Sequence, residues 1–199
     1  MDLEPFHHAF ALTGSIATGK STVVTFLKEE GFHIIDADKI AHEILNEQAQ
    51  IIAETFGEEF VKEKRVDRKA LGRLIFSDNK KRKELEALLH PLIYARIVEK
   101  AEPLEKREEP YIIDIPLFFE SGRYAIEKVI VVYTTKEQQL ERMMNRDGLS
   151  KEEALWRIEA QIDIEDKVKY ASYVIDNRGD LKQLQSETIR VKEEILGEL

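Results

Sequence analysis

One glycine-rich segment near the N-terminus limits the fold of this 199-residue chain more than any other feature. The spacing G-x-x-x-x-G-K-[ST] is matched in full by Gly14, Ser15, Ile16, Ala17, Thr18, Gly19, Lys20 and Ser21. Such a turn wraps backbone N–H groups around a phosphate, and its glycines allow a close approach that a Cβ would block. The segment predicts nucleoside triphosphate binding, with Lys20 on the β- and γ-phosphates and the Ser21 hydroxyl on Mg²⁺.

Hydrophobic patterns place this segment in an alternating α/β chain. Short apolar runs predict strands at residues 10–12, 32–35, 111–115, 129–133 and 173–175. Helical spacing from Ser21 to Leu27, ended by Gly31, predicts the first strand–helix–strand unit. Capping-box patterns predict helices that begin near Lys136 and Lys151, and a last helix follows over residues 181–196. The expected fold is a three-layer phosphate-loop α/β fold around a five-stranded parallel sheet.

The remaining segments predict insertions into this core. Apolar residues recur every three or four places over residues 40–109, with no strand expected, so this insertion is predicted to be helical. A second helical insertion, predicted to act as a lid, covers residues 136–170. The nucleotide-binding core is then expected to comprise residues 1–39, 110–135 and 171–199.

Composition excludes several classes of function. The formal net charge of −9 is unfavourable for a broad nucleic-acid or anionic-membrane binder, and no cysteine is present to supply a thiolate. The first ten residues do not resemble a signal peptide, and no apolar stretch approaches the roughly 20 residues that span a bilayer. We therefore expect a cytoplasmic protein with small-molecule substrates, monomeric or weakly oligomeric, that binds neither nucleic acid nor membrane.

The motifs around the phosphate loop favour a small-molecule kinase. A guanine-specific N/T-K-x-D motif is absent, which excludes a switch GTPase. Asp36 and Asp38 follow the second expected strand, at the sheet edge where open α/β folds bind ligands, although either residue could simply cap the next helix. Asp114 ends the third expected strand, a position from which a carboxylate can hold Mg²⁺.

Six segments together resemble the dephospho-coenzyme A kinase family. They are ALTGSIATGKST, IIDADKIAHEI, LLHPLI, DIPLFFE, VVYTTKEQQLERMMNRDGLS and YVIDNRG, and they follow the family's order along nearly the whole chain. The resemblance implies transfer of the ATP γ-phosphate to the ribose 3′-hydroxyl of dephospho-coenzyme A, with Mg²⁺ as cofactor. One departure is that the family's loop usually has glycines where this chain has Ser15 and Ala17. Because every backbone N–H is kept, binding is expected to survive with altered affinity.

The resemblance also implies individual roles. Asp38 is similar to the family's proposed general base, and Lys20 and Arg146 would stabilise the transferring phosphoryl group. ATP would be contacted by the loop together with Thr22, Arg142 and Asn177, where Asn177 corresponds to the position that recognises adenine. The acceptor would be bound by Asp38, Arg73, Phe76, His90 and Asp114. Pro91 is expected to break its helix and to offer His90 toward the acceptor.

Three alternatives remain open at this point. The chain could phosphorylate another small hydroxyl compound, such as a nucleoside or shikimate. It could be a regulatory module that binds a nucleotide without transferring phosphate, or a nucleic-acid-dependent ATPase. The identity of the acceptor depends on residues 40–109, and tight ATP binding without chemistry would favour the regulatory module.

Overall fold

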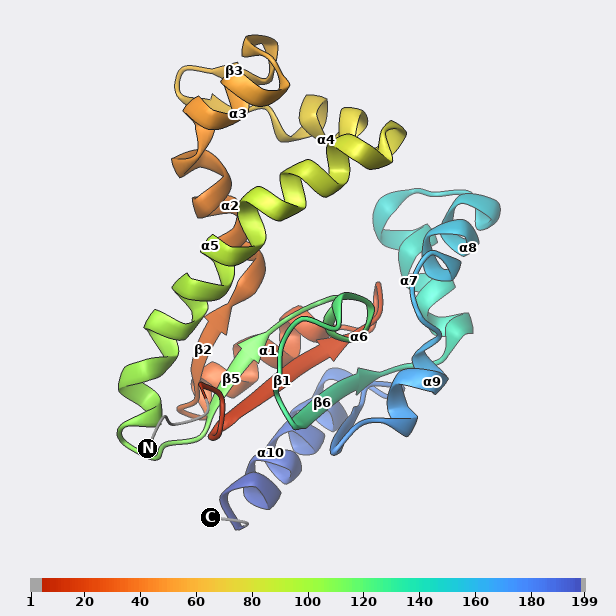
Figure 1. The fold of residues 1–199 in the computed structure, drawn as a ribbon. Coiled ribbons are helices and arrows are strands. Elements are labelled where there is room, and N and C mark those ends of the chain that lie inside the picture. The colour runs from red at the N-terminus through yellow and green to blue at the C-terminus, as the bar shows by residue number, and fades with distance from the viewer. Residues whose placement is uncertain (1–4, 198–199) are drawn as a thin grey trace. The chain divides into compact units, whose positions relative to one another are not determined.

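The computed structural model describes residues 5–197 and contains a central five-stranded sheet (Figure 1). Its strands are β1 (Ala9–Gly14), β2 (His33–Asp36), β5 (Tyr111–Asp114), β6 (Lys128–Tyr133) and β7 (Tyr173–Asp176), in the order β2-β5-β1-β6-β7. β1 pairs in parallel with β5 and β6, and β6 pairs in parallel with β7. The parallel α/β sheet expected from the sequence is confirmed, with all five strands near their expected positions.

Helices connect these strands. They are α1 (Lys20–Glu29), α6 (Phe118–Ser121), α7 (Lys136–Asp147), α8 (Lys151–Glu159), α9 (Ile164–Lys169) and α10 (Leu181–Gly197). Four of them, α1, α7, α8 and α10, begin where the sequence predicts, whereas α6 and α9 have no counterpart in the prediction. At the start of α8, Ser150 and Glu153 form the full reciprocal capping box. At the start of α7 only half of the box forms, because Gln138 Oε1 accepts from the Thr134 hydroxyl over 2.6 Å. The Gln138 side-chain Nε2 donates to the Arg178 carbonyl 2.8 Å away. That bond ties α7 to the loop after β7.

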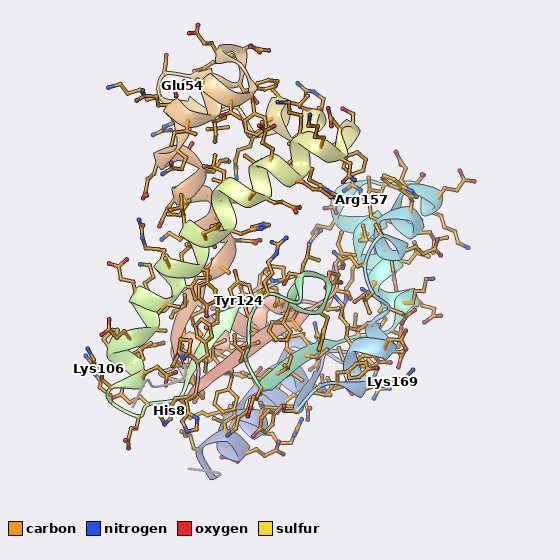
Figure 2. All side chains as sticks on the ribbon, in the orientation of Figure 1. His8, Glu54, Lys106, Tyr124, Arg157 and Lys169 are labelled. Atoms are coloured by element: carbon orange, nitrogen blue, oxygen red, sulfur yellow. The ribbon has the colours of Figure 1, made fainter. Side chains whose placement is uncertain are left out.

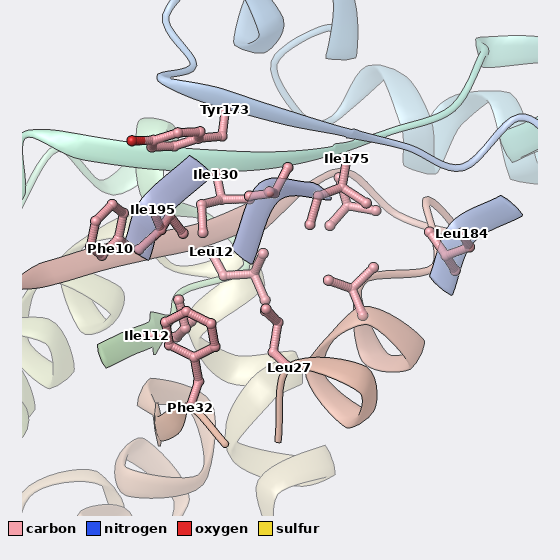
Figure 3. Close-up of a cluster of buried hydrophobic side chains, with 13 residues drawn as sticks. Phe10, Leu12, Leu27, Phe32, Ile112, Ile130, Tyr173, Ile175, Leu184 and Ile195 are labelled. Atoms are coloured by element: carbon pink, nitrogen blue, oxygen red, sulfur yellow. The ribbon is translucent and has the colours of Figure 1, made fainter. Parts of the chain in front are cut away.

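One face of the sheet packs on α1 and α10 and forms the main core (Figure 3). Phe10 and Leu12, two residues apart on β1, point to this face because side chains alternate along a strand. They meet Leu27 of α1 and Leu184 of α10, all nearly inaccessible to solvent. The intervening strand residues are buried as well, which is typical of a parallel sheet covered on both faces.

The chain divides into two compact units. The first unit joins the residues up to Ile35 with those from Ala101 onward and contains most of the sheet, and the second unit comprises residues 36–100. The second unit contains α2 (Ala37–Glu47), α3 (Ala49–Phe56), the short 3₁₀ helix η1 (Glu58–Phe60), β3 (Val61–Lys62), β4 (Arg65–Val66) and α4 (Arg68–Ser77). The long helix α5 (Asn79–Glu105) then returns to the first unit. The predicted acceptor role of this insertion and the predicted lid role of residues 136–170 stay predictions.

The prediction that residues 40–109 contain no strand is wrong. β3 and β4 pair antiparallel as a small hairpin, with Val61 opposite Val66. The turn between them uses Glu63 and Lys64, both with positive φ, of 50° and 61° respectively. Two-residue hairpin turns normally carry glycine, asparagine or aspartate at such positions, so the sequence contains no hairpin signal here. The Val66 N–H also donates to the Asn46 side chain 3.1 Å away, which holds the hairpin on α2.

The expected helix break at Pro91 is also absent. α5 continues through Pro91 as one helix of 27 residues. A proline inside a helix removes one hydrogen bond and crowds the preceding turn, but a long helix with buried residues on both sides can absorb that cost of about 3 kcal/mol. Ile93 and Ile97, which follow Pro91, are both buried. His90 therefore occupies an ordinary helical position.

Within residues 5–197, no helix has the length and apolar character needed to cross a membrane.

Candidate active site

The phosphate loop, residues 14–21, connects the end of β1 to the start of α1 as predicted. Gly14 lies so close to its neighbours that a Cβ there would be 2.6 Å from the Thr18 hydroxyl oxygen and 3.1 Å from the Val132 carbonyl oxygen. Thr18 is fully buried, and its hydroxyl donates to the Ser15 carbonyl over 2.9 Å. Gly14, which has no Cβ, and the Thr18 hydroxyl thus pack together on the inner side of the turn.

Every carbonyl from Gly14 to Thr18 accepts a hydrogen bond. The donors are Lys167 Nζ to Gly14, Thr18 to Ser15, Gln139 Nε2 to Ile16, Arg142 to Ala17, and Asn177 Nδ2 with Arg142 to Thr18. Because a peptide group is planar and trans, fixing a carbonyl also fixes the direction of the next N–H, on the opposite side. The surrounding side chains therefore determine where the N–H groups of the loop point.

Several of these N–H groups have no protein acceptor. In the part of the chain that the structure describes, the N–H groups of Ala17 and Gly19 donate to no protein atom. The first N–H groups of α1 follow directly, and helix N-termini carry such unsatisfied donors and a positive dipole end. An array of this kind binds phosphate. The Ile16 N–H differs, because it donates to Gln161 Oε1 over 2.9 Å.

Gly19 is required for a second reason, its contact with Asn177. It has a φ of 91°, and a Cβ there would lie 2.2 Å from Asn177 Nδ2. Asn177 follows β7 and is buried, and its amide donates to the Thr18 carbonyl over 2.7 Å. One amide hydrogen of Asn177 is therefore bound to the loop, and recognition of adenine by this side chain stays a prediction.

Lys20 and Asp114 lie together beside the loop. Lys20 Nζ forms an ion pair with Asp114 Oδ1, and both side chains are largely buried. Asp114 is the last residue of β5, and its strand partner on β1 is Leu12. The carboxylate expected to hold a metal is thus next to the lysine expected on the phosphates.

The residues at the loop fit a nucleotide-bound magnesium ion. Mg²⁺ prefers oxygen ligands and usually takes one or two from the protein, with the rest from phosphate and water. The Ser21 hydroxyl is exposed in the first turn of α1, and Asp114 supplies a carboxylate. Among residues 5–197 no cluster of three or more His, Cys, Asp or Glu could hold a metal ion by itself.

The two predicted arginines of α7 have different surroundings. Arg142 donates to the Asn177 carbonyl over 2.7 Å and to the loop carbonyls of Ala17 and Thr18 over 3.4 and 3.5 Å. Arg146 lies one turn later, and its exposed guanidinium makes a two-pronged ion pair with Asp147. This pairing holds the pKa of Asp147 below its ordinary value. A phosphoryl group would compete with the Asp147 carboxylate for Arg146.

A cleft of about 590 Å³ opens beside the loop in the first unit. It is bordered by α7, the loop after β7 and the start of α10, and its lining residues include Ala17, Gly19, Arg142, Arg146, Asn177 and Leu181. Cavities of this size hold cofactor-sized ligands, usually on apolar surfaces with a few polar groups. The side chain of Leu181 is exposed, so it offers apolar surface to a flat ring.

The remaining predicted residues belong to the second unit. Asp38 is exposed in the first turn of α2, two residues after Asp36, whose side chain caps the helix by accepting from the Lys39 N–H over 2.8 Å. Arg73 and Phe76 are exposed on α4, and Phe76 is 82% exposed. His90 is half-buried on α5. The roles of these four residues stay predictions.

The sequence analysis missed two side chains that hold the loop. Gln139 bonds to Ile16 and Lys167 to Gly14, yet both lie in polar stretches that are typical of solvated helix surfaces. Gln139 and Lys167 are in fact almost completely buried. A weak signal existed for Lys167, because it follows the apolar Ile164 by three residues and so shares its helix face.

Comparison with known proteins agrees with this geometry. The family model described as Dephospho-CoA kinase matches residues 8–183. A dephospho-CoA kinase from Sulfurimonas denitrificans is 53% identical and covers 96% of this chain and 95% of its own length. One from Helicobacter pylori is 43% identical over 95% of this chain and 98% of its own.

A solved structure of dephospho-CoA kinase from Campylobacter jejuni is also similar. It is 43% identical, covers 96% of this chain and 99% of its own, and has a TM-score of 0.76. Family model, sequence relatives and solved structure all extend over almost the whole chain, including the phosphate loop and the segments around it. The chain therefore belongs to the dephospho-CoA kinase family.

Proposed function

We propose that this chain transfers the γ-phosphoryl group of ATP to the ribose 3′-hydroxyl of dephospho-coenzyme A, giving ADP and coenzyme A. The observation that carries this proposal is the phosphate loop, whose carbonyls are all bonded to surrounding donors and whose N–H groups at Ala17 and Gly19 have no protein acceptor within residues 5–197. Family membership supplies the acceptor. The substrates are two small molecules, so the proposal needs neither nucleic acid nor membrane.

The nucleotide site lies in the first unit. In our proposal, the phosphates bind to the N–H groups of the loop and of the first turn of α1, and Lys20 exchanges Asp114 for the β- and γ-phosphates. The base and ribose occupy the cleft that Asn177 and Leu181 border. Arg142 and Thr22 complete the contacts, and Arg146 leaves Asp147 for the transferring group.

Magnesium would be held by Ser21, with Asp114 as the second candidate ligand. When bound, it would neutralise part of the negative charge on the phosphates. These protein oxygens are few, so the ion would take its other ligands from ATP and water.

The acceptor hydroxyl would be deprotonated by Asp38 as the new P–O bond forms, while the bond from the γ-phosphorus to the bridging oxygen of ADP breaks. A carboxylate can take this proton because the hydroxyl becomes acidic as phosphorus approaches. Arg73, Phe76 and His90 would bind the acceptor from the second unit. The position of Asp38 at the start of α2, just past β2, supports this role.

The test is ADP release from MgATP by the purified protein with dephospho-coenzyme A as acceptor. Parallel reactions contain adenosine or shikimate, and a third set uses Asp38→Asn. We expect release only with dephospho-coenzyme A. We expect Asp38→Asn to lower kcat by about 10²–10⁴-fold, the usual contribution of a general base, with little change in ATP affinity.

Two results would contradict this proposal. Unchanged turnover in Asp38→Asn would remove Asp38 from the mechanism, although the substrate assignment would stand. ATP binding without ADP release in the presence of any acceptor would instead indicate a regulatory nucleotide-binding module. Asp36→Asn is the matched control, because Asp36 caps α2 and has no assigned role in the chemistry.

A further inference from the structure

A buried lysine lies behind the phosphate loop, on the short helix α9. The side chain of Lys167 has no solvent exposure, and its Nζ donates to the Gly14 carbonyl over 2.8 Å. Nζ also lies 2.7 Å from Glu120 Oε1 on α6. An ammonium group removed from water is costly unless a counter-ion and hydrogen bonds replace the solvent. Lys167 has both, and one of its partners is the first residue of the loop.

Glu120 connects this lysine to another segment. Its Oε1 accepts from Lys167 and also from the Ile162 N–H over 3.1 Å. Its other oxygen, Oε2, is buried and accepts no hydrogen bond within residues 5–197. The carboxylate therefore uses one oxygen for two donors, and its negative charge compensates the buried ammonium.

The stretch between α8 and α9 joins the same network. Gln161 Oε1 accepts from the Ile16 N–H over 2.9 Å, and the Ile162 carbonyl accepts from the Ser15 hydroxyl at 3.5 Å. Three consecutive loop residues, Gly14 to Ile16, thus bond to residues 161–167. Of these bonds, the one from Lys167 is buried and charge-assisted, which makes it the strongest.

We propose that Lys167 and Glu120 are positioning residues for phosphate binding. Lys167 fixes the Gly14 carbonyl, and Glu120 fixes Lys167, so that the loop is held in its phosphate-binding conformation before the nucleotide arrives. This inference rests on the proposed function, because it assumes that the loop binds the phosphates of ATP. It predicts that loss of the pair weakens binding of phosphates and leaves binding of the nucleoside part unchanged.

A purely structural ion pair would behave differently. Replacing a buried ion pair by apolar residues of similar volume is often neutral or even stabilising. If Lys167 and Glu120 only fill space, the double variant Glu120→Leu with Lys167→Met should keep both its stability and its nucleotide affinity. If they position the loop, this variant should fold normally but bind phosphates weakly, because the Gly14 carbonyl has lost its donor.

The experiment compares ADP and adenosine affinities by isothermal titration calorimetry in four proteins. These are the wild type, Lys167→Met, the double variant, and Lys169→Met as control. Lys169 is on the same helix, but its side chain is 68% exposed and pairs with Asp166 at the surface (Figure 2). The melting temperature of each protein and its kcat and KM for ATP are measured in parallel.

We expect Lys167→Met to weaken ADP binding about tenfold or more, as for one lost charge-assisted hydrogen bond. The Kd for adenosine should stay within about twofold, and Lys169→Met should match the wild type. The double variant should melt near the wild-type temperature and still bind ADP weakly. If Lys167→Met leaves Glu120 unpaired and therefore does not fold, the double variant still provides the test.

Three outcomes would overturn the inference. The first is wild-type ADP affinity in the double variant, and the second is equal weakening of ADP and adenosine binding, which indicates general damage. A double variant that does not fold would also overturn it, because the pair would then be needed for folding itself. If the wild type does not bind ADP at all, the proposed function fails, independently of this pair.

Discussion

Two positions of the phosphate loop, separated by one residue, have left-handed backbone conformations, but only one of them is a glycine. Gly19 has a φ of 91° and Ala17 a φ of 61°. A left-handed conformation costs a residue with a Cβ roughly 1–2 kcal/mol. Ala17 tolerates this cost because its methyl group packs against a small core that contains Met143 and Ile158. The expectation that the loop survives the Ser15 and Ala17 departures is consistent with this packing.

Gly19 offers a sharper test, because a methyl group there would displace Asn177. Gly19→Ala should raise KM for ATP at least about tenfold, since a Cβ would lie 2.2 Å from Asn177 Nδ2 and the Thr18 carbonyl would lose the nearer of its two donors. Steady-state kinetics with dephospho-coenzyme A as acceptor measure this change. A KM within about twofold of the wild type would show that Asn177 does not hold the loop.

The matched control for this variant is Gly31→Ala. Gly31 has a φ of 94°, nearly that of Gly19, but a Cβ at Gly31 would meet no atom of residues 5–197 within 4 Å beyond its own chain neighbours. Both variants therefore carry the same backbone strain of about 1–2 kcal/mol, seen as a lower free energy of unfolding. Only Gly19→Ala should change KM, so the difference between the two variants isolates the displacement of Asn177.

At the scale of elements, a buried polar cluster joins three of them at the amino end of the sheet. Glu105 ends α5, His8 precedes β1 and Tyr111 begins β5. The Glu105 carboxylate accepts from the His8 N–H over 3.1 Å and from the Tyr111 hydroxyl over 2.7 Å, and its other oxygen lies 2.9 Å from His8 Nδ1. His8 is labelled in Figure 2. The cluster fixes where α5 ends and where two central strands begin.

This cluster predicts a specific loss of stability in alkali. Burial, and then the hydrogen bond to Glu105, raise the pKa of Tyr111 above its ordinary value of 10.0. The folded protein therefore keeps the proton when the unfolded chain releases it, so the contribution of Tyr111 is complete below pH 10 and declines above it. The free energy of unfolding should fall with pH more steeply in the wild type than in Tyr111→Phe, by up to about 1.4 kcal/mol per pH unit.

Urea unfolding of both proteins between about pH 8 and pH 11 measures this difference. At the lower pH the Tyr111→Phe variant should be less stable by about 1 kcal/mol, the usual value of one hydrogen bond. As the pH rises above the ordinary pKa of tyrosine, the two curves should converge. Parallel curves over the whole range would show that Tyr111 does not keep its proton in the folded state.

The sequence predicts most elements of the first unit, because their signals are local. Apolar runs mark the buried strands, and Ser150 with Glu153 marks the start of α8. The two wrong predictions also have local causes. The hairpin was not predicted because Glu63 and Lys64 form its turn without typical turn residues. The helix break was predicted at Pro91, but α5 continues through that residue. The phosphate loop was predictable from its spacing. Lys167 was not, because its burial depends on the fold around it.

At the scale of the whole molecule, the predicted nucleotide residues and most of the predicted acceptor residues belong to different compact units. The phosphate loop, Arg142 and Asn177 lie in the first unit, together with the predicted acceptor residue Asp114. The other predicted acceptor residues, Asp38, Arg73, Phe76 and His90, lie in the second unit, residues 36–100. If this division corresponds to the two substrates, each substrate should protect its own unit. Hydrogen exchange distinguishes the units, because bound ligands slow the local opening of the backbone they contact.

We expect MgADP to slow amide exchange in residues 14–22 and 177–184, which contain the phosphate loop and border the nucleotide cleft. Dephospho-coenzyme A should slow exchange in residues 68–94, which contain the three acceptor candidates on α4 and α5. Adenosine is the control for the base alone and should protect 177–184 without protecting 14–22, since it has no phosphate. Protection of residues 14–22 by dephospho-coenzyme A, with 36–100 unchanged, would place the acceptor in the first unit. The role predicted for Arg73, Phe76 and His90 would then be wrong.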